Sequence, residues 1–367
     1  MIIIMQRYIP TLAGVRRILT ISKGLGEKGV CVKIVFLSTS CGLKCEEQIP
    51  NVSFEYWGDS ISCKNQFLGV VSSAWKLLFK LPKKEPIYYY GLIPLVMLLL
   101  SFHKRNYYHE FTEYPPFIFG KGLYGHIQQK LHIHFMRCCK NIFVISKRLK
   151  KYCVDRGVNE KNIYILNMLV DNNRFAYLSR NPKERYIAYC GNGENFKDGV
   201  DGLIKSFAII AKKDLDIKLY LLGKGPQSDI DVQKEIIREN HLENRVCMLG
   251  LVSANEVPSI LMNAEILALD RPNNIQAEYG FPTKVGEYLL TGNPIVLTKV
   301  GELSDFLVDG ETCLFAEPDN PEDFATKLLW LLTNEKEARK IGEKGKIVAQ
   351  NNFNYKLETD KIIRLLK

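Results

Sequence analysis

Residues 278–298 read EYGFPTKVGEYLLTGNPIVLT, and the order of elements in this stretch decides how the chain folds. Gly280 to Thr283 predict a loop, and Val285 to Leu290 predict a short helix that follows it. Thr291 to Pro294 would end the helix. The β-branched run at 295–297 then predicts a strand in the protein core.

A helix that begins after a Gly/Pro loop directs several free backbone N–H groups and a positive dipole end at one point. Anionic ligands, typically phosphates, bind at such helix starts. Two carboxylates, Glu278 and Glu287, bracket the expected helix start. An anion site flanked by acids indicates a ligand with a phosphate end and a hydroxyl-rich end, such as a nucleotide sugar.

The order GFPTKxxEYLxTGxPxVxT resembles the donor-site signature of glycosyltransferase family 4, the group 1 type of retaining enzymes with the GT-B fold. The resemblance implies that Glu287 binds the ribose hydroxyls of the donor. It also implies a loop that packs around the diphosphate and the sugar, formed by Gly280, Phe281, Pro282, Thr283 and Lys284.

An earlier acid in this family touches the donor sugar, and Glu278 is the candidate catalytic residue for that role. The family commonly has seven residues between the two acids, whereas eight separate Glu278 from Glu287, and Tyr279 occupies the expected position. Either the loop bulges so that Glu278 substitutes, or backbone groups take over from the missing acid.

Two series of alternating strands and helices predict the fold class. Met1–Met5, Val15–Leu25 and Val30–Leu37 read as strand, helix and strand, a βαβ unit of a doubly wound parallel sheet. A second series begins with a strand at 185–189 and a Gly-rich loop that opens into a helix. Together with the resemblance, these patterns predict an α/β chain of GT-B type, with two Rossmann-like doubly wound parallel-sheet domains facing a central cleft.

The length of 367 residues suits two domains that each bury a core. We expect residues 1–172 to form the acceptor-side Rossmann-like domain and residues 173–352 the domain that binds the nucleotide-sugar donor. The polar stretch at 172–184 interrupts the periodic pattern and marks the boundary. The family commonly returns its last helix to the first domain, and residues 353–367 would do so here.

The loop before the first helix carries Ala13-Gly14, followed by Arg16 and Arg17. It is not G-x-G-x-x-G, so a dinucleotide-binding fingerprint is not supported. The resemblance places the family's glycine-rich loop here, which makes Gly14 a candidate donor-binding residue. Arg16 or Arg17 would contact the donor phosphate or an anionic acceptor, while at least one of the two reads as part of a solvated helix face.

Further candidates follow from the resemblance. Lys197 resembles the lysine that neutralises the donor diphosphate, whereas Asn192 stands near the place of the arginine that usually accompanies it. Residues 106–116 predict a short strand that ends in a loop rich in ionisable groups, and open α/β sheets bind ligands at such ends. His109 and Glu113 are therefore candidate catalytic residues on the acceptor side, and a plain surface role for His109 stays open.

The formal net charge of +10 is unevenly distributed. Residues 1–170 contain 24 Lys and Arg against 10 Asp and Glu, a balance of +14, and residues 171–367 contain 26 against 30, a balance of −4. The basic half would meet an anionic partner, such as a membrane surface or a phosphorylated acceptor. No nucleic-acid-binding signature accompanies the charge, so no nucleic-acid partner is expected.

Ten cysteines without metal-ligand spacing, in a sequence without a secretion signal, indicate free thiols in the cytoplasm. The apolar stretch 87–102 is too short for a spanning helix and predicts a core helix. Lysines among large apolar residues at 75–84 suit either the surface of an anionic bilayer or a core helix with snorkelling lysines. These lysines are Lys76, Lys80, Lys83 and Lys84.

The resulting hypothesis is a retaining glycosyltransferase that moves a sugar from a nucleotide diphosphate-sugar to a hydroxyl acceptor, a sugar or a lipid-linked glycan, in cell-surface polysaccharide synthesis (capsule, exopolysaccharide or lipopolysaccharide). No cofactor or metal is expected, because Lys197 and the N–H groups of 281–284 would carry the leaving-group charge. The preferred location is the cytoplasm, peripheral to the inner face of the cell membrane. Open alternatives are a GT-B nucleotide-sugar epimerase, a non-enzymatic sugar-binding protein, and a catalytically weak partner of a polysaccharide assembly complex.

Overall fold

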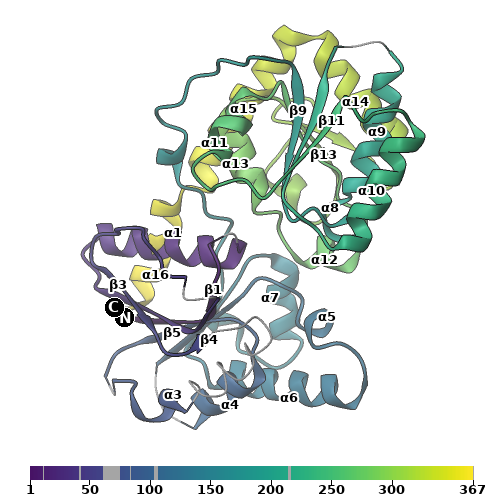
Figure 1. The fold of residues 1–367 in the computed structure, drawn as a ribbon. Helices are drawn as coiled ribbons and strands as arrows, with labels where there is room; N and C mark the ends of the chain where they lie inside the picture. The colour runs from purple at the N-terminus through teal and green to yellow at the C-terminus, as the bar shows by residue number, and fades with distance from the viewer. Residues whose placement is uncertain are drawn as a thin grey trace. The chain divides into compact units, whose positions relative to one another are not determined.

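The computed structural model describes residues 1–10, 12–40, 43–60, 75–82, 84–102, 106–213 and 216–366. The chain divides into two compact units (Figure 1). Unit 1 comprises Met1–Leu169 together with Tyr355–Lys367, and unit 2 comprises Val170–Asn354. Lys83, one of the lysines singled out above, lies outside the described residues.

Unit 1 contains an eight-stranded parallel sheet in the order β3-β2-β1-β5-β6-β7-β8, with β4 paired to β2. Its strands are β1 (Ile2–Tyr8), β2 (Val32–Ser40), β3 (Val52–Tyr56), β4 (Asp59–Ser60), β5 (Ile87–Tyr90), β6 (Tyr107–Phe111), β7 (Asn141–Val144) and β8 (Ile163–Ile165). Its helices are α1 (Ala13–Glu27), α3 (Lys76–Phe79), α4 (Pro94–Ser101), α5 (Pro115–Phe119), α6 (Gly122–Cys138), α7 (Lys147–Val154) and α16 (Tyr355–Leu366).

The first βαβ unit is confirmed, because β1 and β2 pair in parallel on either side of α1 in the chain. β1 continues to Tyr8, beyond the expected end at Met5, since Arg7 and Tyr8 still pair with Ser38 and Thr39 of β2. The last helix, α16, packs on α1. Ile362 of α16 joins the core beneath α1, and the hydroxyl of Tyr355 donates to the Glu27 carboxylate at 2.9 Å.

The expected core helix over 87–102 is wrong in its first half. Residues 87–90 form the buried strand β5, and a helix begins only at Pro94. Gly91, with a φ of 143°, adopts a backbone conformation that ends the strand before the helix begins. Proline fits the first turn of a helix, because the backbone N–H groups there have no partner within the helix. Among the described residues, no helix is both long enough and apolar enough to cross a membrane.

Unit 2 contains a six-stranded parallel sheet in the order β11-β10-β9-β12-β13-β14. Its strands are β9 (Tyr186–Cys190), β10 (Lys218–Leu222), β11 (Val246–Gly250), β12 (Ile266–Leu269), β13 (Ile295–Thr298) and β14 (Leu314–Ala316). Its helices are α8 (Asn195–Asp198), α9 (Val200–Ala211), α10 (Gln227–Glu239), α11 (Val257–Asn263), α12 (Ile275–Tyr279), α13 (Lys284–Thr291), α14 (Pro321–Thr333) and α15 (Glu335–Asn352).

The strand order of unit 2 reverses between β9 and β12. The chain proceeds outward from β9 through β10 to β11, and then from β12 through β13 to β14 on the other side. The helices α9, α10 and α14 pack together, as do α11, α13 and α15 (Figure 1). Open parallel sheets bind ligands at the carboxyl ends of the strands where the order reverses. We therefore expect a ligand-binding site at the edge of the sheet where β9 and β12 end.

Candidate functional site

Within residues 278–298, the expected helix, turn and strand form at this edge. α13 begins at Lys284, Gly292 ends it in a left-handed conformation with a φ of 76°, and β13 follows. The setting of Glu278 differs from expectation, because this acid, expected in the loop before α13, lies in the short helix α12 (275–279). Asn274 caps α12 by accepting hydrogen bonds from the N–H groups of Gln276 and Ala277, each at 3.0 Å.

Two glycine-rich loops, after β9 and after β10, lie against one another with no side chain between them. A Cβ atom on Gly193 would come within 2.5 Å of the backbone nitrogen of Gly225, and Gly193 has a φ of 71°. The side-chain amide of Gln233, in α10, donates to the carbonyl of Gly193 at 2.9 Å and so ties the loop after β9 to α10. Glycine is thus required here both by its φ and by the close approach of the two backbones.

Asp198, at the end of α8, organises the loop after β9. Its carboxylate is 3% exposed, accepts a hydrogen bond from the Tyr189 hydroxyl at 2.5 Å, and pairs with the ammonium group of Lys284. The Lys284 ammonium also lies 5.5 Å from the centre of the Tyr189 ring. One predicted donor-binding residue, Lys284, is therefore held at the carboxyl edge of β9, with 21% of its side chain exposed.

Burial is the largest single influence on the pKa of Asp198 and would raise it. The Lys284 charge, the hydrogen bonds from Lys284 and Tyr189, and the charge of Arg271 together outweigh burial and lower the pKa to about 2. Because the folded pKa lies below that of an unfolded aspartate, the carboxylate stabilises the fold above about pH 4. That contribution is lost as the pH falls toward 2.

Arg271 lies two residues after the end of β12 and brings a further cation to this edge. Its Nε donates to the carbonyl of Lys197 at 3.1 Å, its own carbonyl accepts from the Thr298 hydroxyl at 2.7 Å, and the side chain is buried. The charges of Lys284 and Arg271 thus both act on Asp198, and the backbone of Lys197, the preceding residue, binds Arg271. Arg271 was not singled out from the sequence, although a basic residue at the end of a buried strand was a usable signal.

Glu287 lies three residues after Lys284, so both side chains stand on one face of α13. The Glu287 carboxylate is 27% exposed and pairs with the guanidinium of Arg174. Arg174 also donates to the carbonyl of Ala254 at 2.7 Å, which fixes its position. The stretch that supplies Arg174 reads as a polar linker, and nothing in its composition indicates a partner for Glu287.

The other predicted residues of this stretch have distinct settings. Phe281 is 8% exposed and packs with Phe306 and Phe353, at 5.6 and 5.8 Å between ring centres, so it anchors the loop by apolar contacts. Gly280 is buried, whereas Pro282, Thr283 and Glu278 are half-buried. Glu278 belongs to the first turn of α12, and the sequence expectation of a loop at this acid is therefore corrected.

The predicted residues of unit 1 divide into surface and core positions. Gly14 faces Tyr90 so closely that a Cβ atom would lie 2.7 Å from its ring. The guanidinium of Arg16 pairs with Glu47 and donates to the carbonyl of Pro10 at 3.0 Å. Arg17 is buried, so the alternative of a solvated helix face falls on Arg16 alone.

A buried ion pair joins Arg17 to Glu110. The Nε of Arg17 lies 2.6 Å from the carboxylate, which also accepts from the Tyr88 hydroxyl at 2.5 Å, and the two Nη atoms donate to the carbonyls of Leu166 and Asn167 at 2.8 and 2.9 Å. With every described contact directed to the protein, Arg17 holds α1 to β6 and to the chain after β8. The expected contact with a ligand does not fit this setting.

Replacing Arg17 by Met is expected to lower the free energy of unfolding by about 3–5 kcal/mol, because it leaves the buried Glu110 carboxylate uncompensated. The matched control is Arg16→Met, one residue away, which removes a pair at the surface and should change stability by less than about 1 kcal/mol. Urea unfolding followed by circular dichroism measures both. Equal effects of the two substitutions would contradict the assignment of Arg17 to the core.

His109 is a core residue, which corrects its expected place in the acceptor loop. It lies within β6, is completely buried, and its ring stacks on Tyr89 at 5.5 Å between centres. Its two nitrogens lie 3.2 Å from the carbonyl of Tyr89 and 3.1 Å from Nε2 of His132. Burial lowers the pKa of His109 to about 4, so the ring is neutral at physiological pH. Glu113 follows β6 and is half-buried, so it stays an acceptor-side candidate.

Asp270 lies between β12 and Arg271 and is 5% exposed. Burial, followed by the charges of Asp201 and Asp319, raises its pKa to about 7, against a smaller opposing effect of Lys205. An unfolded aspartate titrates near pH 4. The fold therefore holds the protonated form, and its stability falls as the pH rises through 4 to 7.

Replacing Asp270 by Asn should remove this pH dependence. We expect the variant to be more stable than the wild type at pH 8 by up to about 4 kcal/mol, and by clearly less at pH 5. Urea unfolding at the two pH values measures the difference. The same difference at both values would show that Asp270 does not titrate in this range.

Among the described residues, no group of three His, Cys, Asp or Glu side chains is placed to hold a metal ion. Two aspartates separated by one residue can bind a metal ion together. The chain contains one such triplet, Asp229-Ile230-Asp231, and it lies in α10. Asp229 accepts from the N–H of Asn195 at 2.9 Å, and Asp231 accepts from the side chain of Gln227 at 2.7 Å. Residues two apart on a helix face different directions, so this triplet does not form a chelating pair.

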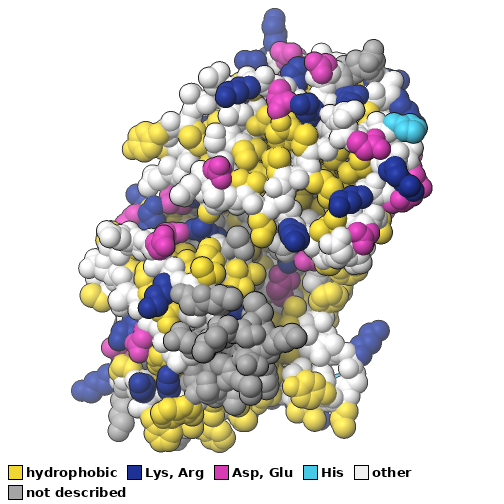
Figure 2. Space-filling model, viewed as in Figure 1, with side chains coloured by type: hydrophobic (Ala, Val, Ile, Leu, Met, Phe, Trp, Pro, Cys, Tyr) yellow, Lys and Arg dark blue, Asp and Glu magenta, His cyan; other side chains and the backbone are white. Residues whose placement is uncertain are grey.

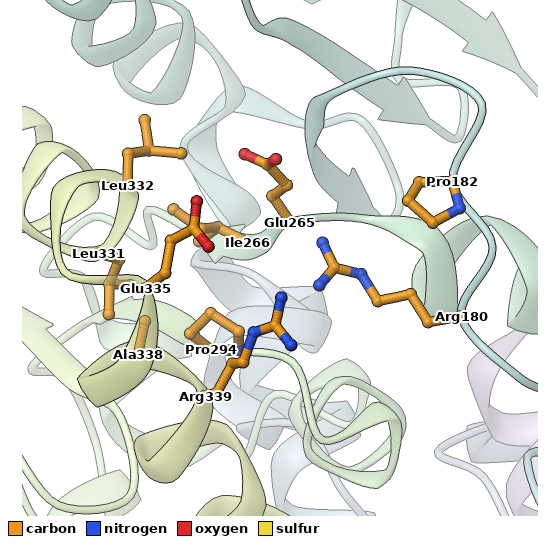
Figure 3. Close-up of a pocket in the computed structure, with 10 residues that line it drawn as sticks. All are labelled: Arg180, Pro182, Glu265, Ile266, Pro294, Leu331, Leu332, Glu335, Ala338 and Arg339. Carbon is orange, nitrogen blue, oxygen red and sulfur yellow. The ribbon is translucent and has the colours of Figure 1, made fainter.

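A hollow of about 460 Å³ lies at the opposite, amino-terminal edge of the same sheet (Figure 3). Ile266 and Pro294, at the starts of β12 and β13, contribute to its apolar lining. The guanidinium groups of Arg180 and Arg339 point toward its centre (Figure 3). None of the predicted donor-binding residues lines this hollow, and it does not belong to the candidate site.

Residues 184–334 match the family model described as Glycosyl transferases group 1. The matched range covers most of unit 2, which is therefore similar to the group 1 glycosyl transferases. The resemblance seen in the sequence is thereby confirmed for this part of the chain. The matched range contains the residues described above around the carboxyl edge except Arg174, which precedes it, and Phe353, which follows it.

Curated relatives and solved structures agree with this assignment. An uncharacterized glycosyltransferase of Methanocaldococcus jannaschii is 31% identical over 196 residues, which cover 50% of this chain and 51% of the relative. Mannosylfructose-phosphate synthase of Agrobacterium fabrum is 24% identical over 247 residues, which cover 62% of this chain and 52% of that enzyme. The chain thus spans about half the length of the curated relatives that it matches.

Two solved structures resemble the whole chain in fold. HepE of Anabaena, solved in complex with UDP-glucose, superposes with a TM-score of 0.79 and 14% identity, covering 100% of this chain and 98% of HepE. Sucrose-phosphate synthase from Thermosynechococcus elongatus gives a TM-score of 0.77 with 16% identity, covering 99% and 97%. At these identities the likeness concerns the fold, and the expected GT-B fold is confirmed.

Proposed function

We propose that this protein is a retaining glycosyltransferase that moves a sugar from a nucleotide diphosphate-sugar to a hydroxyl acceptor. One observation carries the proposal: a cation and a carboxylate, Lys284 and Glu287, stand on one face of α13 at the carboxyl edge of β9 and β12. Side chains three apart on a helix are about 5–6 Å from each other at Cβ. That spacing suits a diphosphate and the ribose joined to it.

In the proposed complex, the donor diphosphate is bound by Lys284, by Lys197 and by the backbone N–H groups of Phe281, Thr283 and Lys284, with Arg271 beside them. The ribose hydroxyls donate to Glu287, whose carboxylate has accessible surface beside its contact with Arg174. The base lies against the end of β11, where Leu249 is partly exposed. Glu278 and the backbone of the adjoining loop position the sugar.

The reaction replaces one bond at the anomeric carbon by another. The bond to the diphosphate oxygen breaks as the bond to the acceptor oxygen forms on the same face, and the hydroxyl proton passes to the departing diphosphate. Negative charge develops on the diphosphate in this step. In the proposed complex Lys284, Lys197 and the helix start stabilise that charge, and groups that the fold already holds in place lower the barrier without reorganisation.

The acceptor that we propose is a sugar or a lipid-linked glycan of a cell-surface polysaccharide, with unit 1 on the acceptor side. In this proposal the protein acts in the cytoplasm, peripheral to the inner face of the cell membrane. The excess of 14 positive charges in residues 1–170 supports binding to an anionic membrane surface, because the negative potential of anionic lipids attracts exposed lysines and arginines.

Incubation with UDP-, GDP- and ADP-sugars, followed by chromatography of nucleotides and sugars, tests the proposal. We expect one donor class to release its nucleotide diphosphate, slowly to water and faster with an acceptor. Conversion to an epimeric nucleotide sugar without release would instead identify an epimerase. Binding without any turnover would identify a non-catalytic partner, and neither outcome is compatible with transfer.

A further inference from the structure

The helices α3, α4 and α6 of unit 1, together with the capping residues Trp75 of α3 and Phe102 of α4, carry large hydrophobic side chains that are exposed. Six of these side chains are more than half exposed, and we refer to them as the apolar face: Trp75, Phe79, Phe102, Leu123, Tyr124 and Ile127, at 51, 75, 71, 82, 73 and 55%. α4 packs against both α3 and α6, so the three helices form one layer. Figure 2 shows hydrophobic side chains gathered along the lower edge of unit 1, over these helices.

Such a surface is unusual for a protein that meets only water. Single exposed hydrophobic residues are common, but several large ones on neighbouring helices mark a site of contact with a protein or a membrane. Trp75 and Phe79 are adjacent, with ring centres 6.0 Å apart. Leu123 and Tyr124 precede Ile127 by four and three residues in α6, so both lie on the same side of the helix as Ile127.

The charges around the apolar face favour a membrane over a protein as its partner. Residues 86–154 contain ten Lys and Arg and only two acidic residues, Glu110 and Glu113. Glu110 is buried against Arg17, which leaves Glu113 as the acidic group with any exposure in this stretch. Lys80, Lys121 and Lys130 are exposed beside the apolar residues, and within the described part of the chain they form no ion pairs.

We propose that the apolar face docks on the headgroup region of an anionic phospholipid membrane. The aromatic and leucine side chains enter the boundary between headgroups and acyl chains, and the lysines contact the lipid phosphates with their stems along the apolar layer. A helix that lies in this boundary needs an apolar side and a basic side rather than a spanning length. The proposal adds a defined surface to the peripheral location proposed above, and it does not depend on catalysis.

Vesicle flotation tests the surface with a matched pair of substitutions. Ile127 of α6 and Ile347 of α15 are both 55% exposed and both lie on long helices, one in each unit. Wild type should float with phosphatidylglycerol vesicles in low salt and remain in solution with phosphatidylcholine vesicles. Ile127→Glu should lower the partition coefficient at least tenfold, and Ile347→Glu should leave it unchanged. The charge-removing variant Lys121→Ala/Lys130→Ala should lower it about fivefold for each lysine.

Three outcomes would overturn the proposal. Wild type that fails to float with phosphatidylglycerol vesicles excludes the membrane as partner, and equal losses for Ile127→Glu and Ile347→Glu exclude this surface. Oligomers of the wild type in light scattering that Ile127→Glu dissociates, without vesicle binding, would assign the apolar face to contacts between copies of the chain. Release of nucleotide diphosphate by each variant in lipid-free solution is measured in parallel, so a failure of the proposed function is recognised separately.

Discussion

Glu287→Ala is expected to lower kcat/KM for donor turnover by about 100-fold, because two ribose hydroxyls would lose a charged acceptor. The effect should appear largely in KM, since the ribose is bound equally in the ground state and the transition state. The fold should survive, because Glu287 is partly exposed and its partner Arg174 keeps its bond to Ala254. Steady-state release of nucleotide diphosphate, measured across donor concentrations, gives both constants.

Two further glutamates serve as comparisons for Glu287. Glu322 lies in the first turn of α14, as Glu287 lies in that of α13, so Glu322→Ala controls for the loss of an acid near a helix start. Glu278→Ala tests the acid of α12, and we expect it to lower kcat more than it raises KM, since the sugar is the part that reacts. Wild-type kinetics for Glu287→Ala would show that the donor-site assignment is wrong.

Lys284→Ala is expected to lower kcat by about 100- to 1,000-fold, the usual result of removing one group that stabilises developing negative charge. The same substitution leaves the buried carboxylate of Asp198 without its cation, which should destabilise the fold by about 3–5 kcal/mol. A loss of activity alone would therefore not distinguish a structural lysine from one that binds the diphosphate.

The double variant Lys284→Ala/Asp198→Asn separates the two roles. Removing the Asp198 charge together with the Lys284 charge should restore most of the stability, because no uncompensated carboxylate remains. Activity should stay low if Lys284 binds the diphosphate. Recovery of both stability and activity would show that Lys284 acts only through Asp198.

The sequence predicted the local structure around these residues closely. The Gly/Pro loop, the helix that holds Lys284 and Glu287, and the strand after Gly292 form as expected, because each depends on residues near in the chain. The apolar stretch 87–102 shows the limit of such reasoning. Its continuous hydrophobicity fits a strand as well as a helix, and Pro94 with Gly91 decided where one ended and the other began.

The sequence alone could not predict which residues contact the predicted site residues. Arg174 reaches Glu287 from 113 positions away, and Asp198 reaches Lys284 from 86 positions away. Such pairs are created by the sheet topology and leave no local pattern. The prediction for His109 was wrong for a related reason. Two adjacent ionisable residues near the end of a short strand indicated an open loop, whereas Tyr89 of β5 and His132 of α6 pack on the His109 ring and bury it.

A crystal structure of the protein with the nucleotide diphosphate-sugar that it turns over would test the central claim most directly. The diphosphate should lie at Lys284 and the start of α13, with the ribose hydroxyls within hydrogen-bonding distance of Glu287. A nucleotide bound elsewhere, such as between Arg180 and Arg339 at the opposite edge of the sheet, would contradict it.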